Sequence, residues 1–185
     1  MKPIRVIPLA GGAIHGAYTE PSLKLLETLA ASLARGFHTA CQIAAEPLDI
    51  SRVFDMKRQQ YYSTAILQHL QQAAHSGERV LGVAAGDLYV PILTFVFGEA
   101  QLDGNCAAVS FARLREEFYG LPAQTSLLQE RLFKESVHEL GHTFGLRHCT
   151  DWSCVMASSY GVEVLDVKGA EFCAECRKVV FQGRG

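Results

Sequence analysis

The sequence predicts an α/β (α+β) protein that forms a single domain over residues 1–185. A chain of 185 residues is long enough to bury one substantial core and too short for two ordinary domains. Through about the first 115 residues, short β-rich runs alternate with longer runs of helical period. Beyond residue 145 the pattern becomes rich in loops. We therefore expect an upper lobe over about residues 1–145 and a lower lobe over about residues 146–185.

Two strand and helix pairs are expected in the first part of the chain. The strands are short runs rich in apolar residues, and the helices have apolar residues three and four positions apart. Glycines at positions 36 and 77 are expected to end the two helices. The pattern predicts strands over residues 4–9 and 39–48, helices over residues 21–33 and 59–75, and a Gly-rich turn at Gly11 and Gly12.

Three short strands follow, and a short helix is expected near the end of the chain. The β-rich runs cover residues 79–85, 92–97 and 107–111, with Gly, Pro, Asp and Asn between them. A weaker helical pattern covers residues 164–181. The alternation of strands and helices favours a sheet covered by helices.

Residues 125–144 give the clearest helical pattern of the chain. They contain no proline, one glycine and apolar residues at helical spacing. Thr125 or Ser126 is expected to cap the N-terminus of this helix. Gly145 stands where a helix C-terminus favours a left-handed residue, so the helix is expected to end there.

Charge and hydropathy exclude several classes of partner. The formal net charge is -2, and lysines and arginines are scattered, so no basic surface for nucleic acid or for an anionic membrane is predicted. No run of about 18 apolar residues is present that could span a bilayer. Gly11 and Gly12 interrupt the first apolar run before the core of a signal peptide could form, so we expect a cytoplasmic protein.

Residues 138–148 (HELGHTFGLRH) carry the strongest chemical signal. His138 and His142 are four positions apart, which places them about 40° apart around a helix and one turn along it. Both imidazoles can therefore bind one metal ion. His148 could not reach the same ion if the helix continued, but a glycine at position 145 with positive φ turns the chain back. The pattern predicts a zinc ion held by His138, His142 and His148.

Three protein ligands leave one position of a tetrahedral zinc ion open to water. Water bound in such a position has a pKa of about 7 and is a usable nucleophile. Glu139, adjacent to His138, is placed to accept the proton of this water and to pass it to the leaving amine. The predicted reaction is hydrolysis of a peptide bond, with peptides or proteins as substrates.

Four cysteines near the C-terminus predict a second, structural zinc ion. Cys149 and Cys154 follow the third histidine, and Cys173 and Cys176 form a CxxC pair. Four thiolates suit a closed tetrahedral site. Such a site would tie the loop after Gly145 to the end of the chain, where little core is available. We therefore expect two zinc ions per chain, one catalytic and one structural.

Other interpretations of the six cysteines are weaker. Two disulfides are disfavoured in a reducing compartment, and the CxxC pair lacks the strand-to-helix turn of a redox-active pair. Cys41 and Cys106 stand apart in apolar stretches and are expected to be buried, unreactive thiols.

These motifs resemble those of one peptidase family. The run HELGHTFGLRHC, then Cys154-Val155-Met156 and the CAEC of residues 173–176, closely resembles the archaemetzincin family of zinc metallopeptidases. A cysteine after the third histidine, as at Cys149, is similar to the residue of that family. Met156 falls where those proteins have the Met-turn methionine. Residues 87–89 (DLY) and 95–100 (FVFGEA) resemble the family more loosely.

The resemblance implies a metzincin-like fold with a mixed twisted sheet, a backing helix, an active-site helix and a small zinc-stapled C-terminal lobe. It implies that residues 93–98 form an edge strand that binds extended substrate, although a buried core strand is the alternative. It also points to aminopeptidase-like activity. The residues themselves leave aminopeptidase and endopeptidase activity both open. The hydroxyl of Tyr160 could stabilise the oxyanion, but a surface or packing tyrosine is the favoured interpretation.

Two other functions are compatible with parts of the pattern. The first is a catalytically silent zinc protein that binds peptides or a partner, because intact ligands do not prove turnover. The second is an interaction module built on the cysteines, which predicts one metal ion per chain and leaves residues 138–148 unexplained. The oligomeric state does not follow from the sequence.

Overall fold

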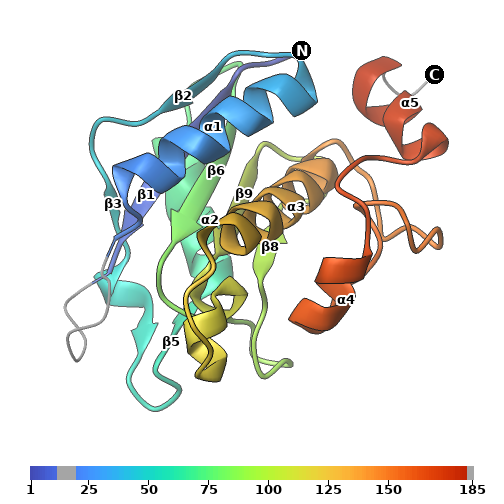
Figure 1. Ribbon diagram of the computed structural model, residues 1–185. Coiled ribbons are helices and arrows are strands. Elements are labelled where there is room, and N and C mark those ends of the chain that lie inside the picture. The colour runs from blue at the N-terminus through green and yellow to red at the C-terminus, as the bar shows by residue number, and fades with distance from the viewer. Residues whose placement is uncertain (12–19, 183–185) are drawn as a thin grey trace.

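A mixed sheet of six strands forms the centre of the molecule (Figure 1). The structure is a computed structural model and describes residues 1–11 and 20–182. All strand pairs of this sheet are parallel except the last, in which the edge strand runs antiparallel to its neighbour. In spatial order the strands are β2 (Cys41–Ile43), β1 (Ile4–Ala10), β6 (Arg79–Ala84), β9 (Cys106–Ser110) and β8 (Gly98–Ala100), and β3 (Leu48–Asp49) also pairs with β1.

A smaller sheet and three short 3-10 helices complete the strand-rich part. In the small sheet, the central strand pairs antiparallel with one neighbour and parallel with the other. Its strands are β4 (Phe54–Asp55), β5 (Gln60–Tyr62) and β7 (Leu88–Tyr89), and the 3-10 helices are η1 (Ser51–Val53), η2 (Ala112–Leu114) and η3 (Glu116–Tyr119).

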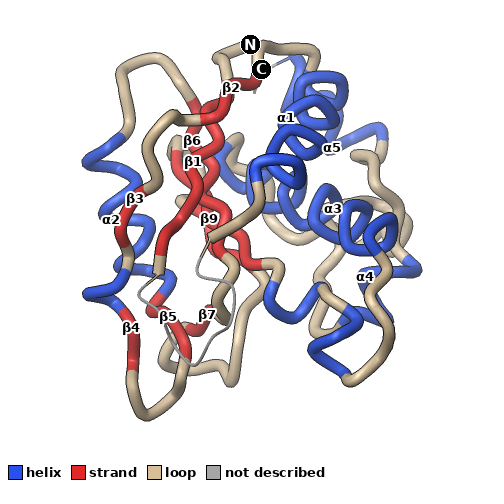
Figure 2. Tube along the Cα trace, turned by 60° about the vertical axis from the view of Figure 1, so that its left-hand side comes forward, coloured by secondary structure: helices blue, strands red, loops and turns tan. Residues whose placement is uncertain are grey.

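Helices cover both faces of the central sheet (Figure 2). The helices α1 (Leu23–Phe37) and α3 (Thr125–Thr143) lie together on one face, and α2 (Ser63–Ala73) lies on the other. Successive residues of a strand point to opposite faces, so the sheet divides two cores. Leu81 of β6 belongs to the core under α1 and α3, whereas its neighbour Val80 belongs to the core under α2.

The chain after Gly145 packs against α3 and contains two further helices. These are α4 (Val162–Val167) and α5 (Ala174–Gln182), drawn in orange and red in Figure 1. Their buried residues Leu165 and Val180 belong to the same core cluster as Leu132 and Leu140 of α3. None of the helices in the described ranges is both long and apolar enough to span a membrane.

Several predicted elements are confirmed within one or two residues. The expected strands over residues 4–9, 79–85 and 107–111 correspond to β1, β6 and β9, and the expected helix over residues 125–144 is α3. Gly145 has a positive φ of 83° directly after this helix, as predicted. The Gly-rich turn expected after β1 extends to Gly12, which lies outside the described residues.

Four predictions of elements were wrong in detail. Residues 60–62, expected to begin a helix, form β5 because Tyr61 pairs with Leu88. The strand expected over residues 39–48 is divided into β2 and β3, and Pro47, which has no N–H to donate, lies between them. The helix expected over residues 164–181 is divided into α4 and α5.

The fourth error concerns residues 92–97, which were expected to form a strand. The family resemblance also implied an edge strand over residues 93–98. Apart from a single bridge between Val96 and Leu88, these residues form turns and loop. Leu93 is 50% exposed, and all of residues 93–98 except Phe97 are exposed or only partly buried, so the alternative of a buried core strand is also wrong. The edge strand begins at Gly98 as β8.

Helix ends differ from the predictions at two positions. The N-cap of α3 is Gln124, without a side-chain hydrogen bond, and neither Thr125 nor Ser126 occupies that position. The first helix continues past Gly36 and ends at His38, which adopts the left-handed conformation with φ of 49°. The ring of Phe133 lies 3.4 Å from the position of a Cβ added to Gly36, an ordinary van der Waals distance.

Candidate metal centre

The structure brings the three predicted histidines together. Nε2 of His138 and Nε2 of His142 are 3.2 Å apart, and one ring nitrogen each of His138, His142 and His148 lies within 4.8 Å of the others. Zinc–nitrogen bonds of about 2.0–2.1 Å in a tetrahedron require nitrogens about 3.3 Å apart. The first two histidines have this spacing, so the donor set fits a zinc ion.

Backbone carbonyls fix the orientation of two of these rings. Nδ1 of His138 lies 2.9 Å from the carbonyl oxygen of Val155, and Nδ1 of His142 lies 2.7 Å from that of Leu146. A carbonyl can only accept a hydrogen bond, so Nδ1 carries the proton in both rings and Nε2 has a free lone pair. Such partners of the non-ligating nitrogen are typical of metal-binding histidines.

The turn after α3 explains how His148 reaches the same point. The N–H of Gly145 donates to the carbonyl of His142 at 2.8 Å, and the N–H of Leu146 donates to that of Gly141. These bonds end the helix and reverse the chain, with Gly145 in the left-handed conformation. The N–H of Asp103 also donates to the carbonyl of His142, which ties this helix end to the turn between β8 and β9.

The surroundings keep the three imidazoles neutral. Burial, and next the charge of Lys168, hold the pKa of His138 well below its usual range. The pKa values of His142 and His148 are also lowered, chiefly by burial. Neutral imidazole is the form that binds a metal ion, so the site is prepared for metal at neutral pH.

Glu139 lies buried on α3 beside His138 and under the edge strand β8. Its Cγ lies 2.6 Å from the position of a Cβ added to Gly98, so only a glycine fits there. Burial, and next the charge of Glu135, raise the pKa of Glu139 well above its usual range. The positive charge of Lys168 acts in the opposite sense and lowers the pKa of Glu139, because it favours the ionised carboxylate.

Substitution of Gly98 with alanine is expected to disturb Glu139. The new methyl group would meet the Glu139 side chain at 2.6 Å and the Ala108 carbonyl oxygen at 2.7 Å. We expect a loss of about 1–3 kcal/mol in unfolding free energy from overpacking and a fall in kcat/KM of about 10- to 100-fold from the displaced carboxylate. Thermal unfolding and steady-state kinetics measure both. Gly36→Ala is the control, since its methyl would lie 3.4 Å from Phe133, and wild-type kinetics of Gly98→Ala would contradict the prediction.

The four C-terminal cysteines also converge. The Sγ atoms of Cys149, Cys154, Cys173 and Cys176 lie within 4.8 Å of one another, and those of Cys149 and Cys173 are 3.8 Å apart. Zinc–sulfur bonds of about 2.3 Å in a tetrahedron give sulfur atoms about 3.8 Å apart, so the donor set fits zinc. The N–H groups of Met156 and Cys173 point at Sγ of Cys154, an arrangement that favours a thiolate.

The two remaining cysteines and two other predicted residues have simpler environments. Cys41 and Cys106 are free thiols, and burial raises the pKa of each to about 11, which disfavours the reactive thiolate. Cys106 is buried as predicted, whereas Cys41 is only partly buried. Met156 is fully buried against Gly141, with Sδ 2.4 Å from the position of a Cβ added there. Tyr160 is 82% exposed, which agrees with a surface tyrosine.

Three residues near the histidines were not predicted from the sequence. Gly98 packs on Glu139, and Lys168 pairs with Glu135 one helical turn before Glu139. The spacing of Glu135 and Glu139 by four residues could have placed Glu135 on the active face of α3. No local signal identifies Lys168 or Gly98, because their partners are distant in the sequence.

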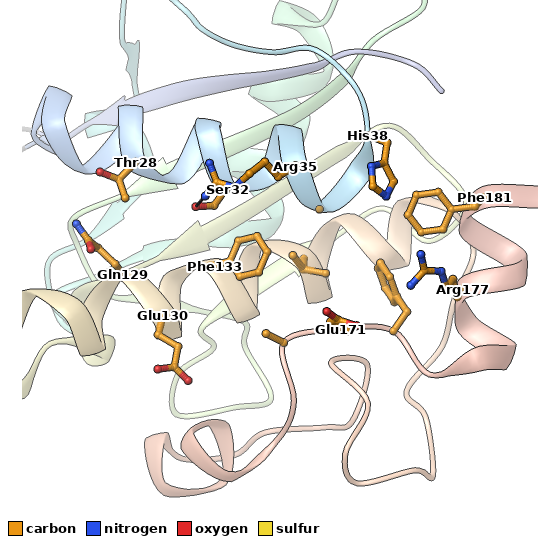
Figure 3. Close-up of a pocket in the computed structure, with 14 residues that line it drawn as sticks. Thr28, Ser32, Arg35, His38, Gln129, Glu130, Phe133, Glu171, Arg177 and Phe181 are labelled. Atoms are coloured by element: carbon orange, nitrogen blue, oxygen red, sulfur yellow. Dashed lines mark hydrogen bonds between the residues drawn. The ribbon is translucent and has the colours of Figure 1, made fainter.

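A separate cavity of about 610 Å³ lies between α1, α3 and the segment that leads into α5 (Figure 3). Figure 3 shows His38, Phe181 and Arg177 at one end of it and Phe133 and Glu171 nearer its middle. Its lining includes none of the seven predicted metal ligands. The volume is in the range of small-molecule sites, but the cavity is distinct from the metal centre.

Comparisons with known proteins agree with the geometry. Residues 44–182 match the model of peptidase family M54. Over 132 residues the chain is 44% identical to an archaemetzincin of Methanocaldococcus jannaschii, which covers 71% of this chain and 72% of that protein.

Two solved structures have the same fold. One is archaemetzincin from Archaeoglobus fulgidus, with 34% identity, a TM-score of 0.79 and coverage of 96% of this chain and 99% of that one. The other is a zinc-dependent peptidase from Methanocorpusculum labreanum, with 28% identity, a TM-score of 0.82 and the same coverage. The chain therefore has the predicted metzincin-like fold, and it belongs to peptidase family M54, the archaemetzincins.

Proposed function

We propose that this zinc metallopeptidase holds its catalytic zinc ion on His138, His142 and His148 and uses Glu139 as general base. One observation carries the proposal: ring nitrogens of three histidines converge at zinc-ligand spacing, and the next residue after His138 is a buried carboxylate. Membership of the family supplies zinc-dependent peptide hydrolysis. The roles of these four residues are our inference.

The chain's own groups account for the movement of protons in this mechanism. A bound zinc ion supplies a water of lowered pKa and a polarised scissile carbonyl. The Glu139 carboxylate accepts the proton of the attacking water, and the resulting acid donates it to the leaving nitrogen. Burial under β8 limits the access of bulk water to this carboxyl group, which favours direct transfer.

Aminopeptidase-like action is the narrower form of the proposal. It is supported by the family resemblance, which points to aminopeptidase-like activity. Peptides with free and with acetylated N-termini test this, and equal kcat/KM values for the two would exclude the preference.

We propose that Cys149, Cys154, Cys173 and Cys176 hold a second, structural zinc ion, and that residues 1–185 act as one metallopeptidase domain. One core cluster contains Ile4 of β1, Leu140 of α3 and Val180 of α5, so the two lobes share their core. A cytoplasmic location is supported by the free state of the cysteines, since thiol ligands persist in reducing compartments.

Removal of metal is expected to separate the two sites. We expect two zinc ions per chain by elemental analysis, because both donor sets have zinc-ligand spacing. A mild chelator should remove first the ion on the three histidines, of which His148 is the exposed member. Peptidase activity should fall with this ion, return on addition of zinc, and leave the thiolate-bound ion in place.

Two outcomes would contradict this prediction. A single zinc ion that resists chelation, with no peptide hydrolysis at any stage, would favour a protein that binds peptides without cleaving them. Activity that persists after the first ion is lost would mean that the histidines do not hold the catalytic metal.

A further inference from the structure

An ion pair lies inside the protein, one helical turn from the proposed zinc ligands. Nζ of Lys168 is 3.1 Å from Oε1 of Glu135, and the two side chains are only 1% and 5% exposed. Lys168 follows the end of α4, and Glu135 belongs to α3. Burying two charges costs desolvation energy that their attraction barely repays, so general stability is a weak explanation for this pair.

Lys168 makes a second contact, to the loop beneath the histidines. Its Nζ lies 3.2 Å from the carbonyl oxygen of Ala157, which accepts a hydrogen bond from it. Ala157 is the last of three successive residues, 155–157, and each of them contacts either α3 or Lys168. Lys168 therefore connects α3, through Glu135, to the backbone of this loop.

The other two residues of the loop contact the metal-binding part of α3 directly. The carbonyl oxygen of Val155 accepts the hydrogen bond from Nδ1 of His138 at 2.9 Å. The Sδ atom of Met156 lies against Gly141, at 2.4 Å from the position of an added Cβ. A displacement of residues 155–157 would thus move the group that orients the ring of His138.

We propose that Lys168, held by Glu135, is a positioning residue that places residues 155–157 against α3 and thereby fixes the ring of His138 for metal binding. The contacts form a closed circuit from Glu135 to Lys168, to Ala157 and Val155, and back to His138 on the same helix. The inference rests on the proposed function, in which the three histidines hold the catalytic zinc ion. Lys168 is not a ligand in it.

Charge and position have opposite consequences for metal affinity. The positive charge of Lys168 lowers the pKa values of His138, His142 and His148. A cation in this place also disfavours a bound dication, so charge alone predicts that Lys168→Met binds metal more tightly. The positioning role predicts weaker binding, because the partner of His138 is released. The sign of the change separates the two explanations.

Lys134, which is next to Glu135 on α3, provides a matched control for Lys168. Its side chain is 4% exposed, and its Nζ donates to the carbonyls of Leu165 and Asp166 at 3.2 and 3.1 Å. It also pairs with Glu130 at 2.8 Å. Lys134 therefore anchors α4 as Lys168 does, but no hydrogen bond joins it to residues 155–157 in the described chain. Lys134→Met removes a buried lysine and leaves the circuit intact.

The test is a titration of the metal-free full-length protein with Co²⁺. Cobalt on four thiolates gives strong charge-transfer absorption in the near ultraviolet, whereas cobalt on three histidines gives only weak visible bands, so both sites are followed in one sample. We expect Lys168→Met to raise the dissociation constant of the histidine site by about 10- to 100-fold and to shift its visible bands. The thiolate site should be unchanged. Lys134→Met should lower the thermal midpoint and leave both cobalt sites unchanged.

Two results would overturn the inference. One is a folded Lys168→Met with equal or tighter Co²⁺ binding at the histidine site. The other is an equal loss of affinity in Lys134→Met, which would show that any weakening of α4 suffices. If Lys168→Met does not fold, the double variant Glu135→Leu/Lys168→Met replaces it, because no unpaired charge then remains buried.

The same titration separates this inference from the proposed function. Wild-type protein that binds Co²⁺ only at the thiolates would contradict the histidine site itself. Wild-type protein that fills both sites, with a Lys168→Met variant of unchanged affinity, would contradict only the positioning role of Lys168.

Discussion

Replacement of Glu139 with glutamine is expected to lower kcat for peptide hydrolysis by about 10²- to 10⁴-fold, the usual contribution of a general base. Glutamine keeps the volume and the hydrogen-bonding oxygen of the side chain, so it fits the same space under Gly98. It cannot accept the proton of the attacking water. Metal content and thermal midpoint should therefore remain close to those of the wild type while turnover is lost, as measured by steady-state kinetics with a peptide substrate.

Glu27→Gln is the matched control for this variant. Glu27 lies exposed on α1, so the same change of charge there should leave both kcat and KM unchanged. If Glu139→Gln binds zinc at the histidines and cleaves peptides at the wild-type rate, Glu139 is not the general base. If Glu139→Gln loses zinc together with activity, the loss of activity reflects the missing metal ion and not the missing proton acceptor. Its kinetics must then be measured on protein reloaded with zinc.

The convergence of the three histidines was predictable because it is encoded locally. His138 and His142 share one turn of α3, and Gly145 is the residue that lets His148 return to them. Spacing within a helix and the positive φ of a glycine depend only on nearby residues. The four cysteines are less local, yet thiolates of this spacing have few other functions in a reducing compartment.

The surroundings of the centre were not predictable because they depend on distant pairings. Lys168 meets Glu135 across 33 positions of the chain. Gly98 meets Glu139 only after β8 has paired with β9, and the sequence alone cannot indicate which residue a glycine must accommodate. Residues 92–97 illustrate the reverse case, since they carry β-forming side chains but form turns and loop apart from one bridge at Val96.

Replacement of Cys173 with serine is expected to destabilise the end of the chain and, through it, the histidine site. Cys173 contacts two other cysteines of the cluster. Its Sγ lies 3.8 Å from Sγ of Cys149, and its backbone nitrogen donates a hydrogen bond to Sγ of Cys154 at 3.3 Å. Structural zinc sites contribute about 10–16 kcal/mol of apparent binding energy in small peptides. The loss of stability in Cys173→Ser should be smaller than this value, because buried residues of α4 and α5 also pack in the core cluster that contains α3.

We therefore expect Cys173→Ser to lose one zinc ion per chain and several kcal/mol of stability. At about 2–4 °C per kcal/mol for a chain of this size, the thermal midpoint should fall by at least about 10 °C. Cys149 directly follows His148, and its N–H donates to the carbonyl of Met156 at 2.9 Å. Loosening the cluster should consequently weaken metal binding at the histidines as well, which elemental analysis and Co²⁺ titration would detect.

Cys41→Ser is the control, since Cys41 is a free thiol at the start of β2, outside the cluster. Exchange of a partly buried thiol for a hydroxyl there should cost about 1–3 kcal/mol and no zinc. An unchanged zinc content in Cys173→Ser would show that the four thiols do not form a metal site. A lost zinc ion with an unchanged thermal midpoint would mean instead that the shared core alone holds the C-terminal helices on α3, and that the cluster serves a purpose other than stability.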